Sequence, residues 1–251
     1  MYRYFEINEN RHNIRCKIYY QDIKNIDRVV IFCHGFGGHK DNGAAEKFAN
    51  RLISKVKGAA MVTFNWPCHG DDVKKQLCLE DCDAYLKQVI DYVKLQFQTE
   101  QIYAYATSFG GYLTLKYISD HGNPFRKIAL RCPAVNMYDV LTKTIMSSED
   151  LKQLQAKKEI LVGFDRKVPL CYSFLEELQN NDIQKLDYPE YAEDILILHG
   201  TADEIVPFDA AYTFAENNLI DFVPVEGADH RFRDTNKMEQ AIKQILNFYG
   251  L

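Results

Sequence analysis

The sequence has no long apolar segment and no excess of basic residues. None of its 251 residues lies in a run approaching the roughly 18 apolar residues that a membrane span needs, and the opening stretch MYRYFEINEN lacks the apolar core of a secretory signal. Binding to a polyanion needs clustered Lys and Arg, so the net charge of −5 argues against nucleic acid as a partner. We therefore expect a cytoplasmic protein without a membrane span.

The sequence also lacks the cysteine and histidine spacings of common metal sites. Its seven cysteines include no CxxC pair, and an odd number without a secretory signal favours reduced thiols over a disulfide framework. Cys78 and Cys82 would share one helix face, but two thiols do not complete a zinc site. No two histidines have HExxH or similar spacing. We expect neither a metal nor a cofactor.

Short apolar runs rich in β-branched and aromatic residues alternate with amphipathic stretches, as in βαβ units. Runs that predict strands buried on both faces are RVVIFCHG, AAMVTFNW, QIYAYAT, KIALRC and DILILHG, with DFVPVEG as a weaker case. An antiparallel pair at one sheet edge is predicted by the period-two alternation of YRYFEI and IRCKIYY. Apolar residues at the helical period predict helices over 80–97 and 237–249.

About sixty residues separate KIALRC from DILILHG, far more than a usual αβ connection with one helix. Two short helices are predicted by SSEDLKQLQAKKE and CYSFLEELQNND, and a hairpin around Gly163 and Asp165 by ILVGFDRKVP. Such an excursion from the carboxyl edge of a parallel sheet is well placed to cover a ligand crevice, and an insertion without function is the alternative. We expect one domain over residues 1–251, with residues 134–190 as an inserted lid.

The stretch YAYATSFGGYLTLKYI places Ser108 between a predicted strand and a predicted helix. A strand, a sharp turn and a helix form a nucleophile elbow, in which a strained serine points its hydroxyl out of the sheet. The turn needs small residues two before and two after the serine. Ala106 and Gly110 meet this limit, although Ala106 replaces the first glycine of GxSxG. Taken alone, the stretch fits a serine that caps a helix equally well.

A nucleophilic serine needs a base and a group that orients the base. Asp203 follows the buried run DILILHG, and we prefer it to Glu204 because it lies nearer the strand end and has the shorter side chain. His230, in VEGADHRF, follows the last predicted strand, and the order Ser, Asp, His is that of α/β-hydrolases. The other six histidines are predicted to brace loops or turns (His34, His69, His199) or to face solvent (His12, His39, His121).

Attack on an acyl group also needs hydrogen-bond donors for the oxyanion. The glycine-bearing stretch HGFGGHKDNG offers the backbone N–H of Phe36, and the second donor would be the N–H of Phe109, the residue after Ser108. A phosphate-binding loop is the alternative for this stretch, but GFGGHK matches neither GxGxxG nor GxxxxGK[ST].

Taken together, these motifs resemble those of the α/β-hydrolase superfamily, and within it the small serine esterases similar to feruloyl or cinnamoyl esterases and the serine-aminopeptidase-like hydrolases. The resemblance covers nearly the whole chain, through HGFGG, FNWPCHGDD, ATSFGG, LHGTADEIVP and GADHRF. It implies an α/β-hydrolase fold: a mostly parallel eight-stranded sheet, helices on both faces, and a lid after the sixth strand. It also implies Ser108, Asp203 and His230 as the triad. The family elbow usually reads GHSxGG, so Ala106 and Thr107 predict different contacts beside the nucleophile.

We expect a serine hydrolase that cleaves carboxylic esters, short-chain or of the aryl or cinnamoyl type. Ser108 would form an acyl-enzyme, with His230 as general base and Asp203 orienting it. A peptidase, thioesterase or acyltransferase could use the same triad, because the pocket sets the carbonyl and the acceptor. A non-catalytic binding protein on this fold is the alternative from another class. An aromatic lid face would suit either a small-molecule substrate or the second subunit of a homodimer.

Overall fold

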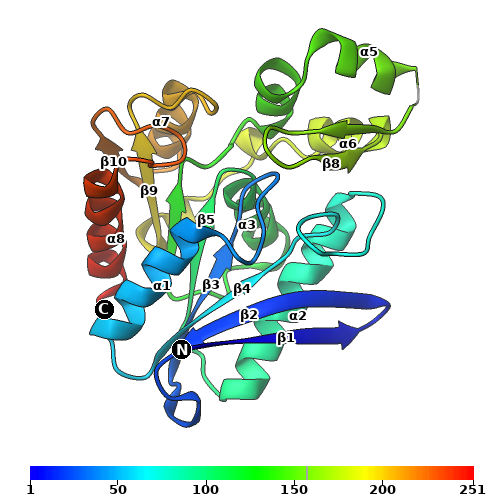
Figure 1. The fold of residues 1–251 in the computed structure, drawn as a ribbon. Coiled ribbons are helices and arrows are strands. Elements are labelled where there is room, and N and C mark those ends of the chain that lie inside the picture. The colour runs from blue at the N-terminus through cyan, green and yellow to red at the C-terminus, as the bar shows by residue number, and fades with distance from the viewer. Residues whose placement is uncertain (157) are drawn as a thin grey trace.

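The structure is a computed structural model that describes residues 1–156 and 158–251. Its central feature is one eight-stranded sheet with the strand order β1-β2-β4-β3-β5-β6-β9-β10 (Figure 1). The strands are β1 (Tyr2–Glu9), β2 (His12–Tyr20), β3 (Arg28–Cys33), β4 (Ala59–Phe64), β5 (Ile102–Thr107), β6 (Ile128–Arg131), β9 (Ile195–Gly200) and β10 (Asp221–Val225). Strand β2 pairs antiparallel with β1 and β4, and all the other pairs are parallel. The predicted fold class and edge pair are confirmed.

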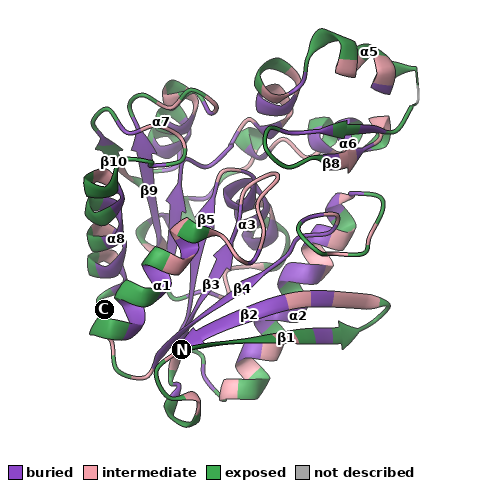
Figure 2. Ribbon diagram, in the orientation of Figure 1, coloured by how far each residue is buried: buried purple, intermediate pink, exposed green. Residues whose placement is uncertain are grey.

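Helices cover both faces of this sheet, because successive strand residues point to opposite sides. In β5, Tyr103 and Tyr105 join the apolar cluster under α1 and α8, whereas Ala104 and Ala106 join the larger cluster under α2 and α3. Figure 2 shows the inner strands of the sheet buried almost throughout and the edge strand β1 mostly exposed. The helices on the sheet are α1 (Gly43–Lys55), α2 (Leu79–Phe97), α3 (Phe109–His121), α7 (Phe208–Asn217) and α8 (Thr235–Tyr249), and the 3-10 turn η1 spans Ile23–Asn25.

The two helices predicted from periodicity both form, with small differences at their starts. Helix α8 begins two residues before the predicted 237–249, because the Asp234 carboxylate caps the N–H groups of Asn236 and Lys237. It ends at Gly250, whose φ of 70° suits glycine. Helix α2 begins one residue before the predicted 80–97. The apolar sequence pattern is weakest for β10, because this strand lies at the sheet edge and is partly exposed.

The excursion between β6 and β9 lies beyond the carboxyl ends of the parallel strands (Figure 1). The predicted hairpin forms from β7 and β8, and the two predicted helices form as α5 and α6. Lys157, near the end of the stretch that predicted α5, lies outside the described residues. The elements here are α4 (Met137–Asp139), the π-helical turn η2 (Val140–Ile145), α5 (Ser148–Gln155), β7 (Ile160–Val162), β8 (Val168–Leu170), α6 (Tyr172–Asn180), η3 (Ile183–Lys185) and η4 (Pro189–Asp194).

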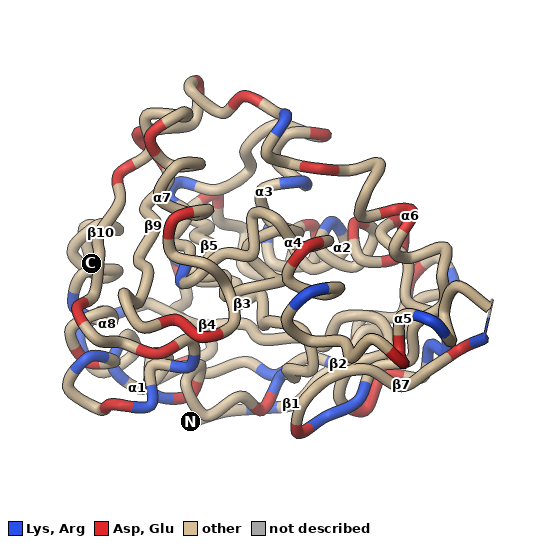
Figure 3. Tube along the Cα trace, turned by 90° about the horizontal axis from the view of Figure 1, so that it is seen from above, with Lys and Arg blue, Asp and Glu red and all other residues tan. Residues whose placement is uncertain are grey.

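Figure 3, which views the molecule from above, shows acidic and basic residues interspersed along the chain. This distribution agrees with the small net charge of −5. Among the described residues, we find no helix with both the length and the apolar character needed to cross a membrane.

Candidate active site

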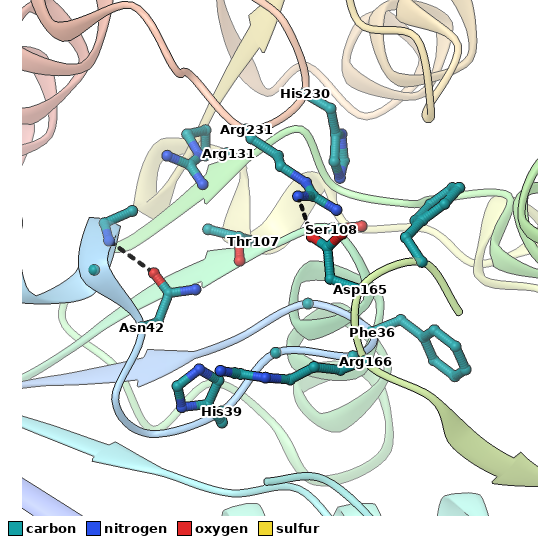
Figure 4. Close-up of a pocket in the computed structure, with 16 residues that line it drawn as sticks. Phe36, His39, Asn42, Thr107, Ser108, Arg131, Asp165, Arg166, His230 and Arg231 are labelled. Carbon is teal, nitrogen blue, oxygen red and sulfur yellow. Dashed lines mark hydrogen bonds and ion pairs between the residues drawn. The ribbon is translucent and has the colours of Figure 1, made fainter. Parts of the chain in front are cut away.

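The carboxyl ends of neighbouring parallel strands meet at one edge of the sheet, where open α/β sheets bind ligands. A pocket of about 440 Å³ opens there (Figure 4). Its walls come from the loop after β3, the end of β5 with Ser108, the end of β6, the turn between β7 and β8, and the loop that carries His230. Five segments that are distant in sequence therefore share one cavity.

Ser108 occupies a strained turn between β5 and α3. Its φ of 52° and ψ of −119° lie where residues with a side chain are rarely found, as the nucleophile-elbow geometry requires. Four backbone hydrogen bonds hold this conformation. The Ser108 N–H donates to the Arg131 carbonyl, and the Ser108 carbonyl accepts from Gly111, Tyr112 and Ala134. The serine is thus fixed by backbone contacts and leaves its hydroxyl on the pocket wall.

Small residues around Ser108 are required where the helix approaches β3. A Cβ on Gly110 would lie 2.1 Å from the carbonyl oxygen of Cys33, a backbone atom that has little freedom to move. Ala106, by contrast, fits inside β5 with its methyl fully buried. The elbow therefore tolerates alanine two residues before the serine but not two residues after it.

We expect Gly110→Ala to lower the free energy of unfolding by about 3 kcal/mol, because relieving the clash with Cys33 must separate α3 from β3. The urea midpoint at unchanged slope measures the loss. Gly43→Ala is the matched control, since a Cβ at the first residue of α1 meets nothing within 4 Å. Equal midpoints for the two variants would contradict this account of the elbow.

Asp203 lies directly behind His230, a residue of the pocket wall. The His230 Nδ1 lies 2.8 Å from the Asp203 Oδ2, and the Asp203 side chain has no exposed surface. The other oxygen, Oδ1, accepts the backbone N–H groups of Ile205 and Val206. With both oxygens bonded, the carboxylate is held in place and orients the imidazole through its Nδ1.

The charge state of Asp203 follows from competing effects. Burial raises the pKa of this carboxyl, but hydrogen bonds from His199 and His230 outweigh burial and hold the pKa well below its usual range. The His199 Nε2 lies 3.2 Å from the same Oδ2. Glu204, the competing carboxylate in the sequence, accepts the backbone N–H of His230 at 3.1 Å instead of meeting the ring.

Ser108 and His230 line the same pocket, and Figure 4 shows both side chains at this cavity. Among the described residues, no hydrogen bond joins the serine hydroxyl to the imidazole. Catalytic hydrogen bonds in enzymes without substrate are often long and form fully only in the complex with substrate. A serine and its base therefore need not be hydrogen-bonded in the structure without substrate.

The two expected oxyanion donors also meet beside Ser108. Neither the N–H of Phe36 nor that of Phe109 donates a hydrogen bond within the described part of the chain, so both lack a protein partner there. Phe36 lines the pocket, whereas Phe109 is buried directly after Ser108. Their rings pack edge to face with centroids 6.0 Å apart, and His69 contacts both. A Cβ on Gly35 would lie only 3.1 Å from the Ser108 Cβ, so the loop after β3 passes directly beside the serine.

The remaining histidines differ in one respect from expectation. His34 braces its loop as predicted, since its buried ring accepts the N–H of Trp66. Burial lowers the pKa of His69 to about 4, and this ring also stays inside. The prediction that His12 faces solvent in a loop is wrong. His12 begins β2, and its ring packs under α2 with Nε2 3.1 Å from Asp81.

Among the described residues, two groups of side chains bring together atoms that could bind a metal ion. Cys132, Asp203 and His230 offer atoms within 4.8 Å of one another, and so do the more exposed Asp83, Asp120 and His121. A thiol ligand must lose its proton, yet burial raises the pKa of Cys132 well above its usual range. The first group is therefore poorly suited to a cation.

The sequence did not single out three arginines that line this pocket: Arg131, Arg166 and Arg231. Arg131 is the second-last residue of the predicted strand KIALRC, where a basic residue is normally expected to face solvent. Arg166 and Arg231 lie in the predicted hairpin and next to His230. Their convergence depends on the strand order, which no local pattern reports.

The fold and the strained serine define an α/β-hydrolase. Residues 45–250 match the prolyl oligopeptidase family, and the chain belongs to this family. Among curated proteins, it is similar to the monoacylglycerol lipase abhd6-B of Xenopus laevis, at 22% identity over 218 residues. The match covers 86% of this chain but 59% of that lipase, so the chain spans less than two thirds of the relative's length.

Solved structures show the same fold. Est1E from Butyrivibrio proteoclasticus aligns with a TM-score of 0.74 at 18% identity, covering 99% of both chains. A second structure of Est1E holds bound ferulic acid and aligns with a TM-score of 0.75 at 17% identity, covering 98% of this chain and all of that one. A putative hydrolase from Agrobacterium vitis aligns with a TM-score of 0.76 at 16% identity, covering 99% and 98% of the two chains.

Proposed function

We propose that this protein is a serine hydrolase that cleaves carboxylic esters through an acyl-enzyme on Ser108. The observation that carries the proposal is the 2.8 Å contact between the buried Asp203 carboxylate and His230, which shares a pocket with a serine held at a φ of 52°. An isolated Asp–His contact is common in proteins. Its combination with a strained serine at the carboxyl edge of the sheet favours nucleophilic catalysis.

In the proposed mechanism, the His230 Nε2 takes the hydroxyl proton of Ser108 as the oxygen attacks the ester carbonyl. The N–H groups of Phe36 and Phe109 stabilise the negative charge that develops on the carbonyl oxygen. Asp203 stabilises the imidazolium, which then protonates the leaving alcohol. Water, activated by His230, releases the acid from Ser108 and restores the enzyme.

We further propose that residues 134–190 act as the lid of a single hydrolase domain. The hairpin of this segment supports the proposal, because Phe164, Asp165 and Arg166 line the pocket. Asp165 also bonds to Arg231, the residue after His230, at 2.7 Å. The lid therefore contributes part of the substrate-binding surface.

Aryl or cinnamoyl esters are our first choice of substrate, since Est1E shares the fold and has been solved with ferulic acid bound. The family name favours a second candidate, a peptidase that uses the same triad. Both reactions pass through an acyl-enzyme, so only the carbonyl accepted by the pocket separates them.

We expect the protein to hydrolyse methyl ferulate and short p-nitrophenyl esters at least 100-fold faster, in kcat/KM, than prolyl p-nitroanilides. The reason is that an alcohol leaves more readily than an amine, and a pocket built for esters offers no compensating contacts. Comparing the two substrate sets under identical conditions measures this ratio. A preference for the anilides would replace the esterase proposal with the peptidase.

A further inference from the structure

The pocket beside Ser108 is more positive than the chain as a whole. Its lining residues include three arginines and a single carboxylate, that of Asp165, in a chain whose net charge is −5. Asp165 is already paired with Arg231, and the exposed Arg166 is solvated. Arg131 is different, because it is 6% exposed.

Arg131 has no anionic partner among the described residues. Its Nε is buried and unpaired, one terminal nitrogen lies 3.5 Å from the Met238 sulfur, and the guanidinium carbon lies 5.1 Å from the centre of the Phe232 ring. A ring face and a thioether hold the side chain in place, but neither neutralises its charge. Buried guanidinium groups are usually paired with a carboxylate or phosphate. The pocket therefore has an unmatched positive charge.

The surroundings of Arg131 would also suit an anion. Arg131 is in register with Thr107, so both side chains lie on the sheet face covered by α1 and α8. Thr107 is 7% exposed, and its hydroxyl bonds to no other described residue. Asn42, which caps α1, and the first two residues of the helix, Gly43 and Ala44, line the same pocket, where the helix dipole favours negative charge. The Asn42 side chain accepts the N–H groups of Ala44 and Ala45, so the Gly43 N–H is the donor left for a ligand at this helix end.

Figure 4 shows Arg131, Thr107 and Asn42 grouped beside the start of α1, within the cavity that contains Ser108. The Arg131 carbonyl accepts the N–H of Ser108, so the two residues are in direct backbone contact. An anion held by Arg131 would thus lie a short distance from the serine, within the length of a small substrate.

We infer that the substrate is an ester that carries a carboxylate, bound by Arg131, the Thr107 hydroxyl and the N-terminus of α1. This inference rests on the proposed function of Ser108 and specifies its substrate class. A single buried guanidinium matches the single charge of a carboxylate. Neutral esters of the same shape leave Arg131 unpaired and bind less well.

The test compares esters of matched shape that differ by one charge. Mono-p-nitrophenyl glutarate against p-nitrophenyl pentanoate places the charge on the acyl side, and 4-acetoxybenzoate against its methyl ester places it on the alcohol side. We expect wild type to prefer the anionic member of one pair by at least 10-fold in kcat/KM. Arg131→Gln should remove that preference, so that the ratio of kcat/KM for the anionic and the neutral member of the pair falls to about 1.

Two further variants separate charge from packing. Arg131→Lys keeps a cation in the pocket and should retain part of the preference. Arg126→Gln removes the same charge from an exposed position before the start of β6, at the end of the strand opposite Arg131. This control should keep the wild-type preference for the anionic ester. Absence of a preference in both ester pairs, or a preference that survives in Arg131→Gln, would overturn the inference.

A binding measurement keeps this inference separate from the proposed reaction. In a Ser108→Ala background, calorimetric titration with monomethyl glutarate reports binding without turnover. We expect a dissociation constant at least 10-fold weaker when Arg131→Gln is added. Equal binding by both proteins, or none by either, would contradict the carboxylate site. Failure of wild type to hydrolyse any of the four esters would instead contradict the esterase proposal.

Discussion

Replacing Ser108 with alanine is expected to lower kcat/KM for p-nitrophenyl acetate by about 10⁵-fold, because the proposed nucleophile is lost. The thiol of Cys132 lies near His230 but does not replace Ser108, since burial raises the pKa of this thiol. The remaining rate would come from the oxyanion donors and from water activated by His230. A spectrophotometric assay of nitrophenolate release at several enzyme concentrations measures the effect.

The control for this variant is Ser119→Ala, an exposed serine near the other end of the same helix, α3. It loses the same atom and should keep the wild-type rate. If Ser108→Ala and wild type hydrolysed the ester at comparable rates that scale with enzyme, Ser108 would not be the nucleophile.

Replacing Asp203 with asparagine should lower kcat by about 10⁴-fold. The Asn side chain can still accept the N–H groups of Ile205 and Val206, so the loop is preserved. Its amide would donate to the His230 Nδ1, and this places the proton on Nε2, where it blocks proton transfer from Ser108. The pH profile of kcat/KM measures the effect, and a loss below 10-fold across the profile would contradict the role of Asp203.

The same variant also tests the charge of Asp203 through stability. Because the folded-state pKa of Asp203 lies below its usual value of 3.8, the ionised form stabilises the fold above that value. This contribution is lost as the pH falls through the folded-state pKa. Asp203→Asn should therefore be less stable than wild type at pH 7, and the two unfolding free energies should converge as the pH drops below 4. A gap that stays constant down to pH 3 would argue against a charged, paired Asp203.

Much of the fold could be predicted because each element has a local cause. Continuous apolar runs such as that of β5 are buried on both faces, and periodic residues such as Ile242 and Ile245 fix α8. The candidate site followed from the rule that functional side chains lie just after the strand ends. That rule places Ser108, Asp203 and His230 at one edge without knowledge of the strand order.

The features that were missed depend on packing between distant segments. His12 appeared as a polar residue near a turn, and only the placement of α2 under β2 brings Asp81 to its ring. Arg131 follows an apolar run, but which face it occupies depends on its register with Thr107. No pattern within KIALRC indicates that α1 begins beside that face. The positive charge of the pocket therefore becomes visible only once the strands and α1 are placed relative to one another.

The central claim is that His230 and Asp203 activate Ser108. Its most direct test is the reaction of wild type with a fluorophosphonate, followed by peptide mass spectrometry. The account predicts one adduct per chain, on the peptide containing Ser108, and slow labelling of Asp203→Asn. An unmodified wild-type protein, or an adduct on another residue, would contradict it.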